Sequence, residues 1–259
     1  MSDRPVTKSD IRAALHSLGI QRGHAIVVHS SLKSFGRVDG GAPAVVEAAM
    51  EAVGPEGVLT MPVYASSTDA HGDLLRTPAP DAPVSTGQIP AAFGRHPQTV
   101  FAEHPLYAYG YYGRDAEELA ATCRRLLVPY GPDQPLTCLF PRRGYIVQLG
   151  TNDVTNTAIH VAEEMADPAY LAEKKSVSGI TVDAFFALPV EERRAILNKH
   201  QAGPRRDFLQ CTPLIAQAGI RRTTRVGTAT AAVTDFTAMC HLLSDALRRN
   251  PGLMIRPAN

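Results

Sequence analysis

The stretch at residues 26–41, IVVHSSLKSFGRVDGG, constrains the fold of this chain more than any other. A short β-branched run leads into a turn rich in hydroxyl groups and glycine, and an apolar helical pattern follows over residues 42–53. A second apolar run, at residues 58–62, follows the turn sequence Gly54-Pro55-Glu56-Gly57. The order strand, helix, strand predicts an α/β fold.

The turn in this stretch offers many N–H and O–H donors. The unpaired amides and the dipole of a helix N-terminus favour an anion such as phosphate at such a place. The turn has neither the Gly-Lys-Ser/Thr ending of a Walker loop nor the dinucleotide pattern G-x-G-x-x-G. Taken alone, it fits a phosphate-bearing cofactor or a plain structural turn.

The rest of the chain continues the α/β pattern without a repeat or a linker, which predicts a single domain over residues 1–259. A first helix carries Ile11, Leu15 and Leu18, with Ser9 or Asp10 as its cap. Residues 66–84 are polar and hold three prolines, as expected of a surface loop. Further helices are expected over residues 87–93, 116–127, 157–165, 191–199, 208–218 and 236–247, and further strands over residues 25–29, 145–149 and 222–226.

Composition limits the partners of the chain. The net charge of +1 provides no overall field toward nucleic acid or an anionic membrane. No apolar run approaches the roughly 18 residues of a membrane span, and the N-terminus resembles no signal peptide, so a cytoplasmic location is expected. The cysteines are far apart and form no C-x-x-C pair, so reduced thiols are expected rather than a zinc site or disulfides.

A second polar segment follows the strand expected at residues 145–149. If a helix begins near Asn156, Thr157, His160 and either Glu163 or Glu164 share one face. A carboxylate fixes the tautomer of a neighbouring histidine and stabilises the imidazolium, which is what a general base requires. The alternative is a solvated surface pair without a function.

Two other chemistries are open for the same histidine. His160 could bind zinc, but His29 and His104 are the only further imidazoles that could join it. Ser30 or Ser31 could form a hydrolase dyad with His160, although the chain has no Gly-x-Ser-x-Gly elbow. Neither contact follows from the sequence alone.

In their order along the chain, these segments resemble the antibiotic N-acetyltransferase family, whose best-known members are aminoglycoside 3-N-acetyltransferases. The resemblance fades between about Asp167 and Arg221 and resumes near Arg225. The matching segments are His29-Ser30-Ser31-Leu32 with Gly36 and Gly40-Gly41, residues 53–62, residues 87–93, His104-Pro105, residues 130–136, the pattern Thr157-x-x-His160-x-x-Glu163, and residues 225–229.

The resemblance implies a layered α/β/α fold with a central mixed sheet, and acetyl-CoA as co-substrate without a metal. It implies that His160 removes the amine proton while Glu163 orients it, and that a group near Ser31 or Thr157 stabilises the oxyanion. No covalent acetyl-enzyme is needed. The residues that would contact the cofactor are His29, Ser30, Ser31, Leu32, Ser34, Phe35 and Gly36, with Ser85, Thr86 and Gly87 as weaker candidates.

The implied acceptor is an amino group of an aminoglycoside, with the 3-N position expected, and a polycation of this kind favours a site with several carboxylates. The same transfer to another amine is the main alternative; a Ser-His hydrolase or a silent CoA-binding protein is a third. The candidate substrate-binding carboxylates are Asp69, Glu103, Asp153, Glu164 and Asp167, with Asp73 and Asp81 also in the long loop.

Two positions depart from the family pattern near the expected site. Val154 stands where many members carry an aspartate, and Gln134 replaces the usual serine of a Gly-x-x-Ser-Pro turn. Both changes bear on which amine is accepted. The tyrosine-rich stretch at residues 107–112 alternates like a strand and could form the contact of a homodimer.

Overall fold

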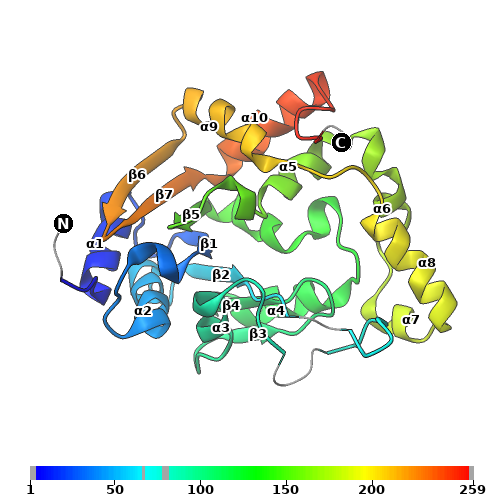
Figure 1. Cartoon of the computed structure of the whole chain (residues 1–259), viewed down its shortest axis with the longest axis horizontal. Helices are drawn as coiled ribbons and strands as arrows, with labels where there is room; N and C mark the ends of the chain where they lie inside the picture. Colours follow the sequence, from blue (N-terminus) through cyan, green and yellow to red (C-terminus); the bar gives the residue numbers. More distant parts are fainter. Residues whose placement is uncertain (1–3, 66–67, 78–81, 257–259) are drawn as a thin grey trace.

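The structure is a computed structural model that describes residues 4–65, 68–77 and 82–256. Over these residues the chain forms a seven-stranded mixed sheet with helices on both faces (Figure 1). Its strands lie in the order β3-β4-β2-β1-β5-β7-β6. They are β1 (Ala25–Ser30), β2 (Val58–Pro62), β3 (Val100–Ala102), β4 (Tyr109–Gly113), β5 (Tyr145–Leu149), β6 (Arg221–Val226) and β7 (Ala229–Asp235).

The centre of the sheet is parallel and its edges are antiparallel. Strand β1 pairs in parallel with β2 on one side and with β5 on the other, whereas β4 and β7 run antiparallel to their neighbours. Since the carboxyl ends of parallel strands meet at one edge, the segments after Ser30, Pro62 and Leu149 emerge together. This edge positions the candidate site.

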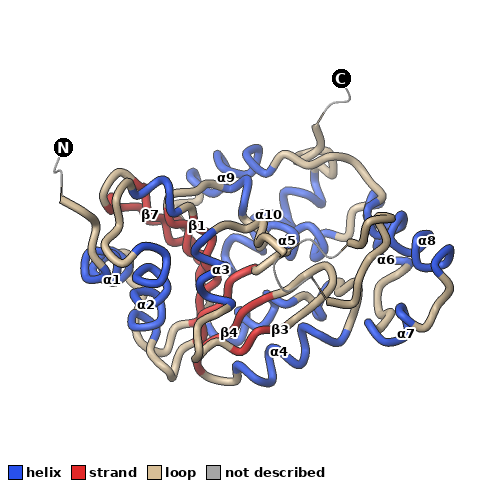
Figure 2. The backbone as a smooth tube through the Cα atoms, turned by 60° about the horizontal axis from the view of Figure 1, so that its bottom comes forward, coloured by secondary structure: helices blue, strands red, loops and turns tan. Residues whose placement is uncertain are grey.

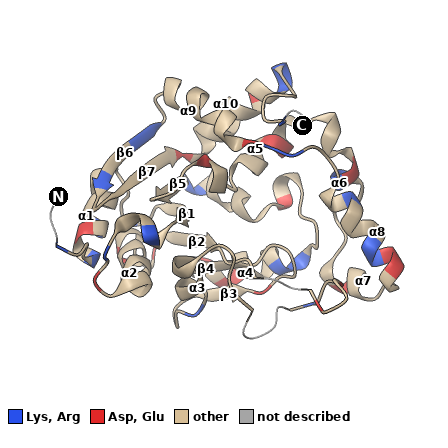
Figure 3. Cartoon of the chain, in the orientation of Figure 1, with Lys and Arg blue, Asp and Glu red and all other residues tan. Residues whose placement is uncertain are grey.

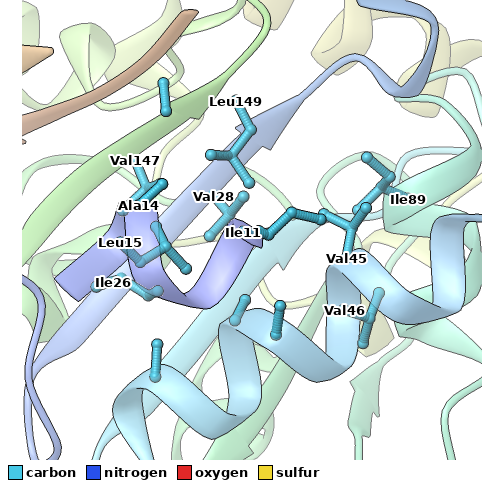
Figure 4. Packing of buried hydrophobic residues seen from close by; sticks show 14 of the residues in the cluster. Ile11, Ala14, Leu15, Ile26, Val28, Val45, Val46, Ile89, Val147 and Leu149 are labelled. Atoms are coloured by element: carbon cyan, nitrogen blue, oxygen red, sulfur yellow. The ribbon is translucent and has the colours of Figure 1, made fainter. Parts of the chain in front are cut away.

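Alternation along β1 divides the core into two layers. Ile26 and Val28 point to one face, and Ala25 and Val27 point to the other, as a period of two residues requires. The first face is covered by α1 (Lys8–Ser17), α2 (Gly41–Val53) and α3 (Gln88–Gly94). Figure 4 shows side chains of α1 and α2 packed against those of β1 and β5.

The opposite face is covered by a second set of helices. Phe236 and Leu243 pack with Ile159 against Val27 and Ile146 of the sheet. The expectation of an α/β/α layered fold is therefore confirmed. The covering helices are α4 (Ala116–Arg125), α5 (Ile159–Ala166), α9 (Thr212–Gln217) and α10 (Phe236–Arg249).

Three further helices form a lobe of their own, α6 (Ala172–Ser176), α7 (Val182–Phe186) and α8 (Val190–Gln201). Figures 1 and 2 show them together at the end of the molecule opposite α1 and α2. A small separate core of Leu74, Leu127, Val128, Val177 and Phe185 supports the lobe. The chain between α5 and α9 thus leaves the sheet and returns to it.

Several expected boundaries differ from the structure. The first helix is capped by Thr7, not by Ser9 or Asp10; the Asp10 carboxylate instead accepts from the Thr7 backbone in a capping box. The helix expected from residue 157 begins at Ile159, and residues 208–218 divide into a 3₁₀ turn and α9. Strands β3 and β7 lie outside all the expected elements, because one is very short and the other is rich in alanine.

Two searches of the described residues bear on the excluded classes. None of the helices in this part of the chain combines the length and apolar character that crossing a membrane requires. Nor do its His, Cys, Asp and Glu side chains form a group of three or more that could hold a metal ion. The cysteines Cys123, Cys138, Cys211 and Cys240 are free thiols.

Candidate functional site

The segments that follow β1 and β5 touch each other at the carboxyl edge of the sheet. After β1 the chain forms a 3₁₀ turn at Leu32–Phe35, and after β5 it turns at Gly150. A Cβ atom at Gly150 would lie 2.5 Å from the Cβ of Ser34, and its φ of 72° disfavours other residues. Glycine therefore allows the two turns to pack closely enough to form one wall.

His160 and Glu163 form a hydrogen-bonded dyad on α5. The Nδ1 atom of His160 lies 3.0 Å from Oε2 of Glu163, one helical turn away. The carboxylate is 1% exposed, whereas the imidazole is 39% exposed. An ionised carboxylate can only accept, so Nδ1 donates and Nε2 is left as an acceptor for a proton. The shared helix face expected for these two residues is confirmed.

Glu163 is held ionised although it is buried. Burial would raise its pKa, but the hydrogen bonds and charges of His160 and Arg206 outweigh burial and lower the pKa to about 2. Its Oε1 accepts from Arg206 Nε at 2.9 Å and from the Tyr170 hydroxyl at 2.8 Å. The carboxylate is therefore available to stabilise a positive charge on the imidazole throughout the neutral range.

One cavity, of about 310 Å³, opens along the end of β1; we call it the β1 cavity. Its wall joins the last residues of β1 with the end of β2, the segment before α3, the segment after β5 and His160. Phe208 packs edge-on against that imidazole, with 4.9 Å between the ring centroids. The lining residues are Val28, His29, Ser30, Pro62, Ser85, Thr86, Pro90, Val154, Thr155, Thr157, His160 and Phe208.

The β1 cavity has polar groups that the protein leaves unpaired. The hydroxyl oxygens of Ser30 and Thr86 are buried and have no hydrogen-bond partner among the described residues. Buried hydroxyls are rarely left unpaired, so these two are suited to a ligand. His29 is buried and neutral, because burial lowers its pKa to about 4 despite the attraction of Asp153. Its Nε2 lies 3.5 Å from the Thr157 hydroxyl.

A second cavity, of about 270 Å³, lies on the other side of His160; we call it the tyrosine cavity. Thr157 and His160 line both cavities, so the imidazole stands between them. The remaining wall consists of Tyr64, Tyr107, Tyr109, Gln134, Pro135, Lys174, His200, Gln201 and Arg206. Two cavities that meet at one base provide separate places for two reactants.

A third cavity, of about 810 Å³, lies beyond the 3₁₀ turn; we call it the arginine cavity. Gly36, Arg37, Arg225 and Thr228 are in its wall. The Thr228 hydroxyl donates to the Ser34 carbonyl at 2.7 Å, which ties the turn to the end of β6. The arginines give this cavity a cationic character that suits an anion.

The residues expected at the cofactor divide into two groups. His29, Ser30, Ser85 and Thr86 line the β1 cavity, and Gly36 lines the arginine cavity. The others shape the turns, where Ser34 donates to Ser31 through their hydroxyls at 3.0 Å. Leu32 packs against the core, and Phe35 is buried within it and also reaches the arginine cavity. Gly87 precedes α3 with a φ of 104°.

The carboxylates expected at the acceptor are engaged elsewhere. Asp153 is buried and binds Arg221 at 2.7 Å; burial would raise its pKa, but the Arg221 contacts lower it. Asp167 pairs with Lys175 and accepts from Tyr130. None of these carboxylates lines the tyrosine cavity.

Three other members of that set also lie outside the tyrosine cavity. Glu164 is buried and accepts from Gly131 N, Gln134 Nε2 and Lys174 Nζ at 2.6–2.7 Å. Asp69 accepts from backbone amides of its own loop, and Glu103 lines a different cavity with Arg124 and Arg125. Asp73 pairs with Arg194 on α8, and Asp81 lies outside the described residues.

Several residues that line the tyrosine cavity lie outside the sequence motifs described above. Tyr64, Tyr107 and Tyr109 come from β2, β4 and their flanks, and Tyr64 donates to Tyr109 at 3.0 Å. Lys174 and Arg206 come from the region between α5 and α9, where the family resemblance fades. The alternation of the tyrosines was a usable signal, but it indicated a packed face rather than a cavity. Lys174 left no sequence signal, and the only signal for Arg206 is that it forms an adjacent pair with Arg205, a pattern that could contact phosphates.

The hydrolase geometry expected of a Ser-His dyad is absent from the described residues. Ser30 lines the same cavity as His160 but its hydroxyl has no partner, and Ser31 bonds to Ser34. His104 lies away from both, with Nε2 bonded to the Leu126 carbonyl. The nucleophile and zinc alternatives therefore find no support in the contacts of these residues.

Comparison with known proteins finds a family model described as aminoglycoside 3-N-acetyltransferase that matches residues 27–248. Aminoglycoside N(3)-acetyltransferase IX from Micromonospora chalcea is 30% identical over 182 residues, which are 64% of this chain and 64% of that protein. An aminoglycoside N(3′)-acetyltransferase-like protein, YokD from Bacillus subtilis, is 32% identical over 178 residues, 61% of this chain and 65% of that protein. The matches thus span less than two thirds of each relative.

Solved structures have the same fold. A complex of AAC-IIIb with CoASH superposes with a TM-score of 0.74 and covers 99% of this chain and 100% of that one. A variant of aminoglycoside acetyltransferase AAC(3)-IVa in complex with apramycin has a TM-score of 0.73 and covers 98% and 96%. At 21% and 20% identity these likenesses establish the arrangement of the sheet and helices.

Proposed function

Because the chain belongs to the aminoglycoside 3-N-acetyltransferase family, we propose that it transfers an acetyl group from acetyl-CoA to a primary amine with His160 as the general base. The single observation that carries the proposal is the placement of His160. Its imidazole stands between the β1 cavity and the tyrosine cavity, with the ionised Glu163 behind it. Each cavity can hold one reactant against the same base.

The β1 cavity is the place for the thioester in this proposal. The unpaired hydroxyls of Ser30 and Thr86 can donate to carbonyl oxygens of the pantetheine arm, and Val154, 55% exposed, offers it an apolar surface. Arg37 and Arg225 of the arginine cavity can pair with the phosphates of the cofactor. The CoASH complex of a family member with this fold supports the choice of cofactor.

The reaction needs one proton acceptor and no covalent intermediate on the protein. The amine, once it has lost its extra proton to solvent, attacks the thioester carbonyl carbon, and its remaining acidic proton passes to Nε2 of His160. Glu163 stabilises the imidazolium through Nδ1. A C–N bond forms, the C–S bond breaks, and the departing sulfur takes the proton from His160. The products are the acetamide and the CoA thiol.

Thr157 is the candidate donor to the oxyanion of this reaction. Its hydroxyl lines both cavities beside His160, and it lies 3.5 Å from the neutral His29. A donor aimed at the place where negative charge develops stabilises the transition state more than the ground state. Ser31, the other candidate, lines neither of these two cavities, and its hydroxyl accepts from Ser34.

The acceptor class has two candidates. The relatives make the 3-amino group of an aminoglycoside the first one to test, and the complex of AAC(3)-IVa with apramycin belongs to the same fold. The second candidate is another amine with the same chemistry. The positive side chains Lys174 and Arg206 in the wall of the tyrosine cavity favour this second candidate.

The test measures thiol release from acetyl-CoA with and without amine acceptors, in the wild type and in the His160→Ala variant. We expect acceptor-dependent release that falls about a hundredfold to ten-thousandfold in the variant. His241→Ala, on the exposed side of α10, is the matched control and should retain the wild-type rate. An equal rate in His160→Ala, with unchanged circular dichroism, would remove the assignment of the base.

A further inference from the structure

The wall of the tyrosine cavity presents two cationic side chains, each paired with a buried carboxylate on its far side. Lys174 and Arg206 both line it, and among the described residues no Asp or Glu does. Figure 3 shows the two signs of charge on neighbouring elements, with acidic residues on α5 and basic residues on α6. The carboxylates belong to the layer beneath the wall.

The carboxylates beneath the wall are not accessible to a ligand. Glu163 and Glu164 are each 1% exposed. Glu163 already accepts from His160, Tyr170 and Arg206, and Glu164 from Gly131, Gln134 and Lys174. Their lone pairs are directed into the protein.

The cations above them retain donors for a ligand. Lys174 gives one ammonium hydrogen to Glu164 at 2.6 Å, and Arg206 gives Nε–H to Glu163 at 2.9 Å and one Nη1 hydrogen to the Pro204 carbonyl. A guanidinium and an ammonium have more N–H groups than these bonds use. Arg206 is 20% exposed and Lys174 12%, so both are more accessible than their partners.

On this basis we infer that the acceptor is a small primary amine that also carries an anionic group, a carboxylate or a phosphate, which binds Lys174 and Arg206 while its amine lies against His160. The inference rests on the proposed acetyl transfer and names its substrate class. A polycation would bring its charges close to Lys174 and Arg206, and the carboxylates that pair with these two residues already accept three hydrogen bonds each. An anion would instead accept the N–H groups of Lys174 and Arg206 that the protein does not use.

The size of the cavity agrees with a small acceptor. Its volume of about 270 Å³ is below the roughly 300–1,000 Å³ of sites that enclose drug-sized ligands. The tyrosine hydroxyls of Tyr64, Tyr107 and Tyr109 add polar contacts along a short path between the cations and His160. An amine and an anion separated by a few bonds fit such a site.

The experiment compares acceptors that share an amine and differ in the anion. The matched pairs are γ-aminobutyrate with n-propylamine, and O-phosphoethanolamine with ethanolamine; gentamicin and apramycin represent polycations. Steady-state thiol release from acetyl-CoA gives kcat/KM for each. We expect kcat/KM for each amine that carries an anion to exceed that of its anion-free partner by about 10- to 100-fold, because a charge-assisted hydrogen bond in a part-buried site contributes that much to binding. The two pairs distinguish a carboxylate from a phosphate.

The variant Lys174→Gln tests the charge, because glutamine can still donate to Glu164. In this variant, we expect the ratio of kcat/KM for an amine that carries an anion to kcat/KM for its anion-free partner to fall about tenfold or more. The ratio is taken within one protein preparation, so a smaller folded fraction cancels. Lys175→Gln changes the neighbouring lysine, which pairs with Asp167 outside the cavity, and should leave the ratio as in the wild type.

Three results would overturn the inference. If gentamicin or apramycin reacts with a higher kcat/KM than either anionic amine, the proposed acetyl transfer stands and the anionic acceptor is wrong. An unchanged ratio in Lys174→Gln has the same meaning. If none of these amines supports thiol release, although acetyl-CoA binds by calorimetry, the acetyl transfer itself fails with the inference.

Discussion

The two walls that flank His160 are built in different ways. The wall of the β1 cavity comes from the ends of β1 and β2, the start of α3 with the segment before it, and the segment after β5, and all of it except Phe208 is close in sequence to a motif. The wall of the tyrosine cavity comes from the segment after β2, from β4 and the segment before it, from the turn at Gln134-Pro135, from α6 and α8, and from the segment before α9, which lie far apart in the chain. In the proposed reaction, this difference would separate the acetyl-CoA side, which depends on motif residues, from an acceptor side that can change independently.

The interactions that stabilise the walls also differ between the two cavities. The β1 side depends on close backbone approach, as at Gly150, and on hydroxyl groups left unpaired for a ligand. The tyrosine side depends on buried ion pairs that join α5 to α6 and to Arg206. Substitutions on the two sides should therefore differ in what they change: affinity for acetyl-CoA on one side, and acceptor choice together with stability on the other.

The largest effect is expected from Glu163→Gln. The change leaves Arg206 without its buried partner and His160 without its anion, so we expect a loss of about 3–5 kcal/mol in the free energy of unfolding and of about a hundredfold in kcat. Urea denaturation and steady-state kinetics measure the two. Glu173→Gln, on the exposed side of α6, is the matched control.

The pH dependence of stability sharpens this prediction. The pKa of Glu163 is lowered from 4.5 to about 2 in the folded chain, so the unfolded chain binds more protons between these values. Its stabilising contribution is complete above pH 4.5 and is lost as the pH falls toward about 2. Denaturation curves of the wild type should thus weaken in this window more steeply than those of Glu163→Gln. Parallel curves would contradict the ion-pair role.

Asp153→Asn is expected to have the next largest effect, and it tests the β1 side. Asp153 is fully buried and pairs with Arg221, so we expect a loss of about 3 kcal/mol in stability with little change in the KM for the amine. Thermal and urea unfolding measure the loss, with Asp245→Asn on α10 as an exposed control. A large rise in the amine KM at unchanged stability would instead make Asp153 a substrate ligand.

A smaller effect is expected from Arg225→Gln. If Arg225 pairs with a phosphate of acetyl-CoA at the exposed edge of the arginine cavity, its loss should raise the KM for acetyl-CoA about three- to fivefold. The amine KM should stay constant, and the KM for acetyl-CoA should become less sensitive to salt. Arg222→Gln on the same strand provides the control. A change in both KM values would break the separation of the two sides.

The smallest effect is expected from Glu103→Gln. Glu103 is exposed and lines a cavity with Arg124 and Arg125, away from both walls. Stability should change by less than about 0.5 kcal/mol, and neither KM should change. Gentamicin kinetics and urea denaturation check this. A rise in the KM for gentamicin would restore Glu103 as an acceptor residue and oppose the anionic-acceptor inference.

The sequence by itself determined the parts of this protein that depend on neighbouring residues. The α/β class and the strands at β1, β2 and β5 follow from short apolar runs that alternate with helical periods. Helical spacing puts His160 beside Glu163 or Glu164, and the family resemblance selects Glu163. The hydroxyl-rich turn after β1 fits a cofactor or a structural turn when taken alone, and the order of all the motifs along the chain favours the cofactor. Local geometry fixes such features, so local patterns reveal them.

Only the tertiary structure decided which charges face a ligand. Asp153 and Glu164 look like acceptor carboxylates in the sequence, but Arg221 neutralises the first from a strand 68 residues away and Lys174 neutralises the second from the next α-helix. Lys174, His200 and Arg206 reach the tyrosine cavity from the lobe and the segment that follows it, where no motif marks them. Burial and pairing across long sequence separations set the charge of a cavity wall, and a residue's type and spacing do not contain that information.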